Sequence, residues 1–144
     1  MEIDGIRFIA TQYAWRYIGT WYKWGGDDPS GFDCSGFVCE LLQAVGLIHR
    51  GERLNAAGIY ERFADKLVQT PYEGCLVFYA KKDDLSSIIH IEYCLDDVHS
   101  IGASGGGSAT VSVEKAIEQN AFIKIRPFRS REPIYAFVDP FRQT

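Results

Sequence analysis

Several features that would assign this sequence to a functional class at once are missing. No apolar run approaches the roughly 20 residues that a membrane-spanning helix needs. Basic residues are not in excess, because 15 Lys and Arg stand against 19 Asp and Glu and the net charge is -4. Such a chain has no basic field to attract a polyphosphate backbone. We therefore expect neither a membrane span nor a nucleic-acid partner.

Metal-binding and phosphate-binding motifs are also missing. The chain has four cysteines and three histidines, but no CxxC pair and no paired histidine spacing. The segment DDPSGFD lacks the alternating acids and the distant Glu of a calcium loop. The segment GASGGGS lacks the Lys-Ser/Thr ending of a phosphate loop. We expect no metal and no cofactor.

What is present is the composition of a globular protein. With 144 residues, 47% hydrophobic and 24% charged, the chain is expected to form one domain over residues 1–144. The N-terminal segment has no basic stretch followed by an apolar stretch and a small-residue cleavage site, so a secretory signal is not expected. We accordingly expect the chain to be cytoplasmic when made and its cysteines to be reduced.

Hydrophobic periodicity predicts helices in the first half of the chain and strands in the second. Helical spacing runs from Ile6 to Ile18 after a possible cap at Asp4, from Cys34 to Val45 after Asp33, and from Ile59 to Leu67 after Asn55. Residues 20–33 are expected to form an irregular loop. Strands are expected at residues 75–80, 88–95, 98–104, 122–125 and 134–138, which together form a small sheet.

Cys34 is the cysteine that lies between a Gly-rich loop and the start of a helix. A thiolate is stabilised at a helix N-terminus, and the amides of the first turn point at the oxyanion that forms when it attacks a carbonyl. The alternative is that Cys34 is a small hydrophobic residue of the core. That core role is the one we expect for Cys39, Cys75 and Cys94, which lie within apolar segments.

His90 is the candidate general base. It alternates with apolar residues in the strand of residues 88–95, so it is either a catalytic histidine or a satisfied, semi-exposed one. Glu92 shares its face, about 6 to 7 Å along the strand, and either holds the imidazole or is an exposed strand glutamate. His49 is expected in a solvated loop, and His99 is expected near a hairpin turn, about 10 Å from His90.

Three segments, GTWYKWGGDDPSGFDCSGFV, GCLVFYA and HIEYCL, closely resemble the NlpC-type, or p-sixty, family of peptidoglycan peptidases. The resemblance spans roughly Ile6 to Ser104. It implies a papain-like α+β fold, in which a helical half carries the cysteine and an antiparallel sheet carries the histidine. It also implies a cysteine peptidase that cleaves stem peptides of the bacterial cell wall between the γ-carboxyl of D-glutamate and a diamino acid.

Carried over by position, the resemblance makes Cys34 the nucleophile and His90 the base. It implies that the Tyr22 hydroxyl helps to bind substrate or the oxyanion. It also puts Asp33 and Ser35 where family members bind the amine of a substrate with a free L-Ala end. Two positions depart from the family pattern. The family's third catalytic residue, usually a His about twelve positions after the base, falls on Gly102, which has no side chain. The acid of the family segment Gly-Asp-Leu-Val-Phe is replaced by Cys75.

Three functions follow as hypotheses from the resemblance. The first is hydrolysis of peptidoglycan or muropeptide through an acyl-enzyme. The second, suggested by the missing side chain at Gly102, is a non-catalytic module that binds wall peptide or assembles a phage tail. A lipid acyltransferase or thioesterase ranks last, because such permuted relatives place His before Cys. The alternatives for reaching the substrate are that the chain processes imported muropeptides, or that a phage tail, lysis or a secretion apparatus delivers it to the wall.

Overall fold

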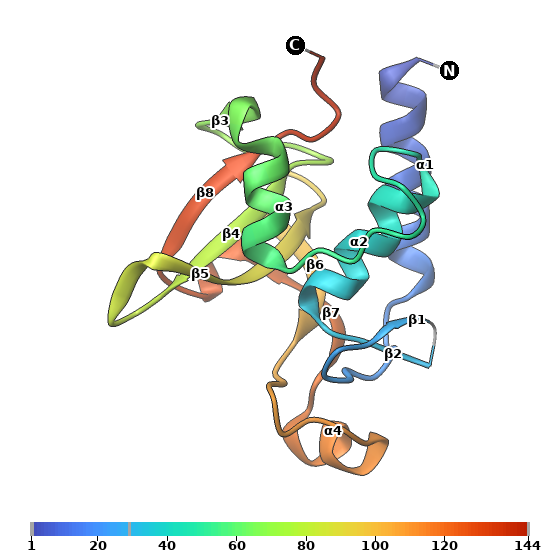
Figure 1. Ribbon diagram of the computed structural model, residues 1–144, viewed down its shortest axis with the longest axis vertical. Helices are drawn as coiled ribbons and strands as arrows, with labels where there is room; N and C mark the ends of the chain where they lie inside the picture. The colour runs from blue at the N-terminus through green and yellow to red at the C-terminus, as the bar shows by residue number, and fades with distance from the viewer. Residues whose placement is uncertain (1, 29, 144) are drawn as a thin grey trace.

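The computed structural model describes residues 2–28 and 30–143, which form helices packed against one side of an antiparallel sheet (Figure 1). The helices that cover the sheet are α1 (Ile3–Arg16), α2 (Cys34–Ala44) and α3 (Ala56–Phe63). The six strands lie in the order β3-β8-β4-β5-β6-β7. Their bounds are β3 (Leu67–Val68), β4 (Leu76–Lys81), β5 (Asp84–Cys94), β6 (His99–Ser104), β7 (Phe122–Pro127) and β8 (Ile134–Val138).

This architecture confirms the predicted α+β fold, with the cysteine at the start of a helix and the histidine in an antiparallel sheet. Two of the predicted helix caps are also confirmed. The side chain of Asp33 accepts a hydrogen bond from the Gly36 amide, and that of Asn55 accepts one from the Gly58 amide. The prediction for the first helix was wrong at its start, because Glu2 is the N-cap and Asp4 lies inside the first turn.

The smaller elements were not predicted. A hairpin of β1 (Asp27–Asp28) and β2 (Gly31–Phe32) forms where an irregular loop was expected, and Leu67 belongs to β3 rather than to a helix. Helix α4 (Val113–Gln119) lies at the end of the molecule away from the chain termini (Figure 1) and buries only Ala116. Two short 3-10 helices, η1 (Ala64–Lys66) and η2 (Phe128–Ser130), complete the fold.

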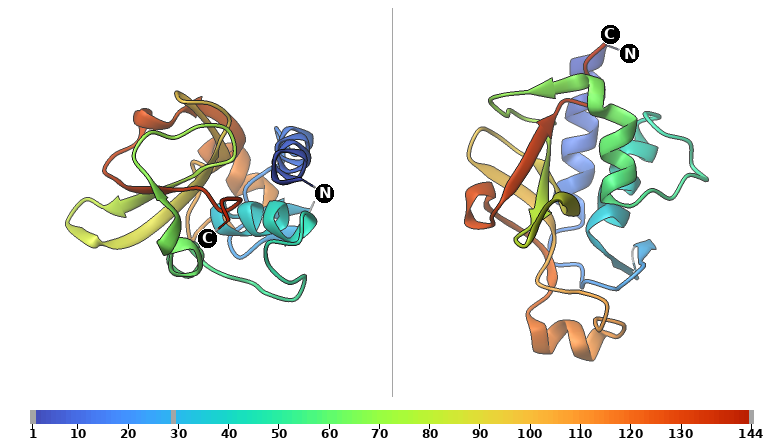
Figure 2. Two further views of the ribbon diagram at one scale, coloured as in Figure 1. Left: turned by 90° about the horizontal axis from the view of Figure 1, so that it is seen from above. Right: turned by 60° about the vertical axis from the view of Figure 1, so that its left-hand side comes forward.

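Both faces of the central sheet are covered. Viewed from above, the helices lie on one face (Figure 2), and the main core between them and the sheet includes Ile91 and Tyr93 of β5. A second, smaller cluster covers the opposite face and consists of Cys75, Val77, Tyr79, Cys94, Phe128 and Phe137. His90 and Glu92 of β5, for which exposed positions were one of two alternatives, therefore lie on a covered face. Within the described residues, no helix is both long and apolar enough to cross a membrane.

Candidate active site

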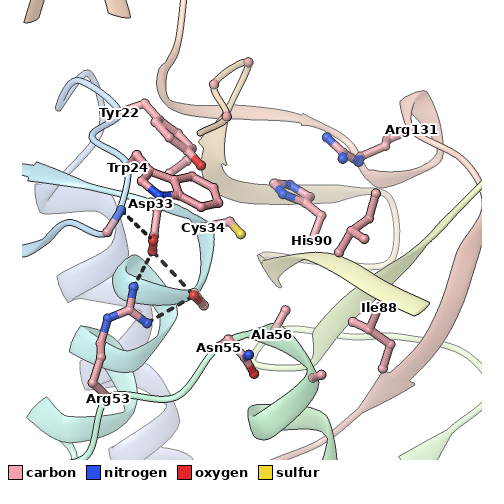
Figure 3. A pocket seen from close by; sticks show the side chains of 18 residues that line it. Tyr22, Trp24, Asp33, Cys34, Arg53, Asn55, Ala56, Ile88, His90 and Arg131 are labelled. Carbon is pink, nitrogen blue, oxygen red and sulfur yellow. Dashed lines mark hydrogen bonds and ion pairs between the residues drawn. The ribbon is translucent and has the colours of Figure 1, made fainter. Parts of the chain in front are cut away.

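A cavity of about 760 Å³ opens between the N-terminus of α2 and strand β5. Its lining includes Cys34 and His90, whose side chains point toward one another across it (Figure 3). The start of α3 lies along one side of the cavity, and the glycine loop at residues 105–107 lies along another. The fold thus brings together a nucleophile candidate from the helical half and a base candidate from the sheet.

Cys34 is the first residue of α2, and the preceding residue fixes the start of that helix. Oδ1 of Asp33 accepts a hydrogen bond from the Gly36 amide at 2.7 Å, and Oδ2 accepts one from the Gly25 amide at 3.1 Å. A Cβ atom on Gly36 would lie 1.9 Å from the carbonyl oxygen of Gly26, so only glycine permits this loop to approach the helix. The half-buried thiol of Cys34 is therefore presented from a rigid turn.

Arg53, which was not predicted as a site residue, also binds the Asp33 carboxylate. Its Nη2 lies 2.6 Å from Oδ1 of Asp33, and its Nη1 donates to the hydroxyl of Ser35 at 3.1 Å. The two residues expected to bind a substrate amine, Asp33 and Ser35, are therefore already linked to a cation of the protein. No sequence pattern marked Arg53, because it lies 19 residues after Cys34 in a loop without periodicity.

His90 is buried, with 5% of its surface exposed, and its ring is fixed by Glu92. Nε2 of His90 lies 2.7 Å from Oε2 of Glu92, which is itself 2% exposed. An ionised carboxylate only accepts hydrogen bonds, so Nε2 carries the hydrogen and donates it to Glu92. Nδ1 is then the ring nitrogen that is left for the thiol of Cys34.

Glu92 is held by further contacts with residues of β6 and β7. The Ser100 hydroxyl donates to Oε1 of Glu92 at 2.7 Å, and Nη2 of Arg126 lies 3.5 Å from Oε2. Gly102 of β6 makes room for this side chain, because a Cβ atom there would lie 2.5 Å from Cγ of Glu92. The position without a side chain is therefore filled by Glu92, and of the two alternatives for this residue the exposed strand glutamate is contradicted.

The two buried groups stabilise each other's charged forms. Burial acts to lower the pKa of His90, but the nearby Cys34 side chain and the hydrogen bond with Glu92 raise this pKa above its ordinary value. Burial acts to raise the pKa of Glu92, but hydrogen bonds from His90 and Ser100 and the charge of Arg126 lower it below its ordinary value. The arrangement favours an imidazolium that donates to the Glu92 carboxylate, with the Cys34 side chain facing the other side of the ring.

Tyr22 lies beside this pair and is almost completely buried. Burial raises the pKa of its phenol, and the nearby Cys34 and Asp33 raise it further. The hydroxyl therefore stays neutral and is available as a hydrogen-bond donor at the Cys34 end of the cavity. A Cβ atom on Gly106 would lie 2.4 Å from the Tyr22 ring, so the glycine loop packs closely on this tyrosine.

The other thiols and imidazoles lie outside the cavity. Cys39, Cys75 and Cys94 are buried, as predicted, and burial raises the pKa of each thiol, that of Cys75 to about 11. His49 is exposed, as predicted. Nδ1 of His99 lies 3.1 Å from Oδ2 of Asp96, at the turn between β5 and β6 where it was expected.

Comparison with known proteins agrees with this geometry. Residues 19–127 match the model of the NlpC/P60 family. Over 46 residues the chain is 60% identical to Protein P54 of Enterococcus faecium, a match that covers 31% of the chain and 8% of that protein. Over 62 residues it is 39% identical to the probable peptidoglycan endopeptidase LytE of Bacillus subtilis, covering 43% of the chain and 17% of LytE.

The fold matches solved structures as well. The NlpC/p60 domain of the peptidoglycan hydrolase SagA superposes with a TM-score of 0.63 at 23% identity, over 92% of this chain and 97% of that domain. The chain spans less than a fifth of the length of the two curated relatives it matches. Since the family model covers most of the chain, including both cavity residues Cys34 and His90, the chain belongs to the NlpC/P60 family.

Proposed function

We propose that the chain is a cysteine peptidase that hydrolyses the stem peptides of bacterial peptidoglycan. The observation that carries this proposal is the hydrogen-bonded pair of His90 and Glu92, 2.7 Å apart, facing the thiol of Cys34 across a cavity. A nucleophile, a base and a group that orients the base are the parts that covalent acyl transfer requires. The names of LytE, a probable peptidoglycan endopeptidase, and SagA, a peptidoglycan hydrolase, support the substrate class.

The proposed reaction has two halves. The Cys34 thiolate adds to the peptide carbonyl, and the amides at the start of α2 and the Tyr22 hydroxyl stabilise the oxyanion. The tetrahedral adduct collapses as His90 gives its proton to the leaving amine, which leaves a thioester on Cys34. His90 then takes a proton from water, the resulting hydroxide attacks the thioester, and the acid and the free thiol are regenerated.

The finer proposal is that the bond cleaved joins the γ-carboxyl of D-glutamate to a diamino acid. In this proposal Tyr22, Asp33 and Ser35 contact the acyl half of the substrate, because they lie on the Cys34 side of the cavity. Arg53 already compensates the charge of Asp33, so a substrate amine that binds there shares this carboxylate with the guanidinium.

Mass spectrometry of muropeptides released from purified cell wall tests both the proposed peptidase activity and the proposed bond. We expect products with a new D-glutamate carboxyl and a new diamino acid amine. Cys34→Ala and His90→Ala should abolish their release, whereas His99→Ala, which changes an exposed histidine outside the cavity, should not. Undiminished release by Cys34→Ala would overturn the proposal.

The same experiment addresses the alternative of a non-catalytic wall-binding module. That alternative was suggested by the absence of a side chain at Gly102, and the structure places the Glu92 carboxylate in that space. If the unmodified protein binds wall peptide but releases nothing, the binding module is the correct assignment and the peptidase is not.

A further inference from the structure

We propose that Arg131 forms a subsite that binds a carboxylate on the amino acid released as the leaving group. This inference rests on the proposed peptidase function and adds a specificity-determining residue to it. Arg131 lies between η2 and β8, in a part of the chain outside the segments that resemble the family and outside the family match. It lines the same cavity as Cys34 and His90.

A fixed aromatic platform positions the Arg131 guanidinium. Cζ of Arg131 lies 5.6 Å from the centre of the Tyr79 ring, and Tyr79 is 1% exposed. The Tyr79 hydroxyl donates to the carbonyl of Phe128 at 2.6 Å, so the ring is held in place. The same ring lies 5.5 Å from the His90 ring, and Figure 3 shows Arg131 at the His90 end of the cavity.

Arg131 supplies positive charge that the protein does not compensate. Within residues 2–28 and 30–143, no carboxylate forms an ion pair with it and no hydrogen bond fixes it. The other guanidinium that lines the cavity, Arg53, is paired with Asp33 at 2.6 Å. A free guanidinium on an aromatic ring in a cleft is suited to a carboxylate, which it binds through two parallel hydrogen bonds.

In the proposed mechanism, the carboxylate that Arg131 binds belongs to the leaving half of the substrate. His90 protonates the leaving amine, so the leaving amino acid lies at the His90 end of the cavity. Arg131 and His90 contact the same Tyr79 ring, so one amino acid with a long side chain reaches from one to the other. Diaminopimelate carries a carboxylate on its side chain, whereas lysine does not. A stem peptide that ends at the diamino acid also offers its main-chain carboxylate.

Steady-state kinetics on matched peptides tests the subsite. The probes are L-Ala-γ-D-Glu-diaminopimelate, its side-chain amide, the lysine analogue, and a form extended by D-Ala that blocks the main-chain carboxylate. For Arg131→Ala we expect kcat/KM on the free acid to fall by about 10- to 100-fold, mainly through KM, because a charge-assisted pair is lost. Arg129→Ala, an exposed arginine outside the cavity, is the matched control and should change kcat/KM less than about twofold.

Comparison of the four peptides identifies the carboxylate that Arg131 binds. If this carboxylate is on the diaminopimelate side chain, Arg131→Ala should not change kcat/KM for the side-chain amide or the lysine peptide. If it is on the main chain, Arg131→Ala should not change kcat/KM for the peptide extended by D-Ala. An equal loss for all four probes, or no loss for any, overturns the subsite.

A binding measurement separates this inference from the peptidase proposal. Calorimetric titration of Cys34→Ala with the free-acid tripeptide, with and without Arg131→Ala, reports the subsite without any turnover. Weaker binding in the double variant together with no hydrolysis by the unmodified protein supports the subsite and refutes the peptidase. Hydrolysis together with unchanged binding refutes the subsite alone.

Discussion

The side chain of Glu92 on β5 occupies space that Gly102 leaves open on the neighbouring strand β6. The Glu92 side chain crosses the space above Gly102 to reach Nε2 of His90, and the Ser100 hydroxyl holds its other oxygen at 2.7 Å. The family resemblance puts a third catalytic side chain on β6, at the position of Gly102. In this chain the same space is filled from β5, so the contact to the imidazole is made by a carboxylate of the histidine's own strand.

Gly102→Ala is expected to impair catalysis through Glu92. The new methyl group would lie 2.5 Å from Cγ of Glu92, so the carboxylate must move off the imidazole. A misplacement of about 1 Å in a catalytic arrangement costs up to about a hundredfold in rate, and we expect kcat to fall by this order with the fold retained. Gly51→Ala, where no atom lies within 4 Å of the added carbon, is the control. Equal kcat values for the two variants would contradict the coupling.

Glu92→Gln is expected to change the pH dependence of hydrolysis. The Glu92 charge helps to raise the pKa of His90, so the neutral amide should let His90 lose its proton at a lower pH. The alkaline limb of the kcat/KM profile should move to lower pH, and the maximum should fall by about tenfold or more. Glu118→Gln, which changes an exposed carboxylate paired with Lys115, should leave the profile unchanged. An unshifted alkaline limb in Glu92→Gln would show that Glu92 has no such influence.

At the residue scale, the sequence could predict some of the active-site positions but not all of them. Local spacing was enough to place Cys34 at a helix start and His90 and Glu92 on one face of a strand. Whether that face is buried depends on Phe128 and Phe137, which are distant in the chain and pack against it. The roles of Arg53 and Arg131 depend on loops whose course no hydrophobic period describes.

Among the elements, α2 determines where the thiol lies. Asp33 caps this helix and also binds Arg53, so the helix start is tied to the loop before α3. The longer helices and strands were predicted because each buries an apolar face with a regular period. The β1–β2 hairpin, β3 and α4 were missed because two-residue strands have no period and α4 buries a single alanine.

Asp33→Ala should destabilise the fold more than Asn55→Ala, the corresponding change at the N-cap of α3. Loss of an N-cap costs about 1 kcal/mol in the free energy of unfolding. Asp33→Ala also leaves Arg53, which is about one-third exposed, and the Gly25 amide without their partner, so we expect about 1 to 2 kcal/mol more. Urea denaturation of both variants measures the difference, and equal losses would show that the Arg53 contact contributes little.

At the scale of the whole molecule, an ion pair joins the first helix to the segment that follows the last strand. Arg7 of α1 pairs with Asp139, which follows β8, at 3.1 Å, and Tyr72 donates to the same carboxylate at 2.6 Å. Asp139 is 2% exposed. The N-terminal helix, the loop before β4 and the segment after β8 therefore meet at one buried carboxylate, through residues that are not part of the cavity lining.

Arg7→Ala should lower the stability of the entire fold without a direct effect on the active site. Removing the guanidinium leaves the buried Asp139 carboxylate with neutral donors only, and we expect a loss of about 2 to 3 kcal/mol. Arg16→Ala on the same helix changes an exposed arginine that lies over the Tyr13 ring, and should change stability by less than about 0.5 kcal/mol. Urea unfolding of both variants makes the comparison, and similar losses would contradict the role of Asp139.

In the proposed function, one thiol, that of Cys34, carries out the hydrolysis of wall peptide. The most direct test is to treat the protein with iodoacetamide at about pH 6, and to measure in the same samples the fraction of each cysteine modified and the rate of muropeptide release. We predict that Cys34 alone reacts, since burial raises the pKa of the other three thiols, and that activity falls in proportion to its modification. Activity that survives complete modification of Cys34 would contradict the account.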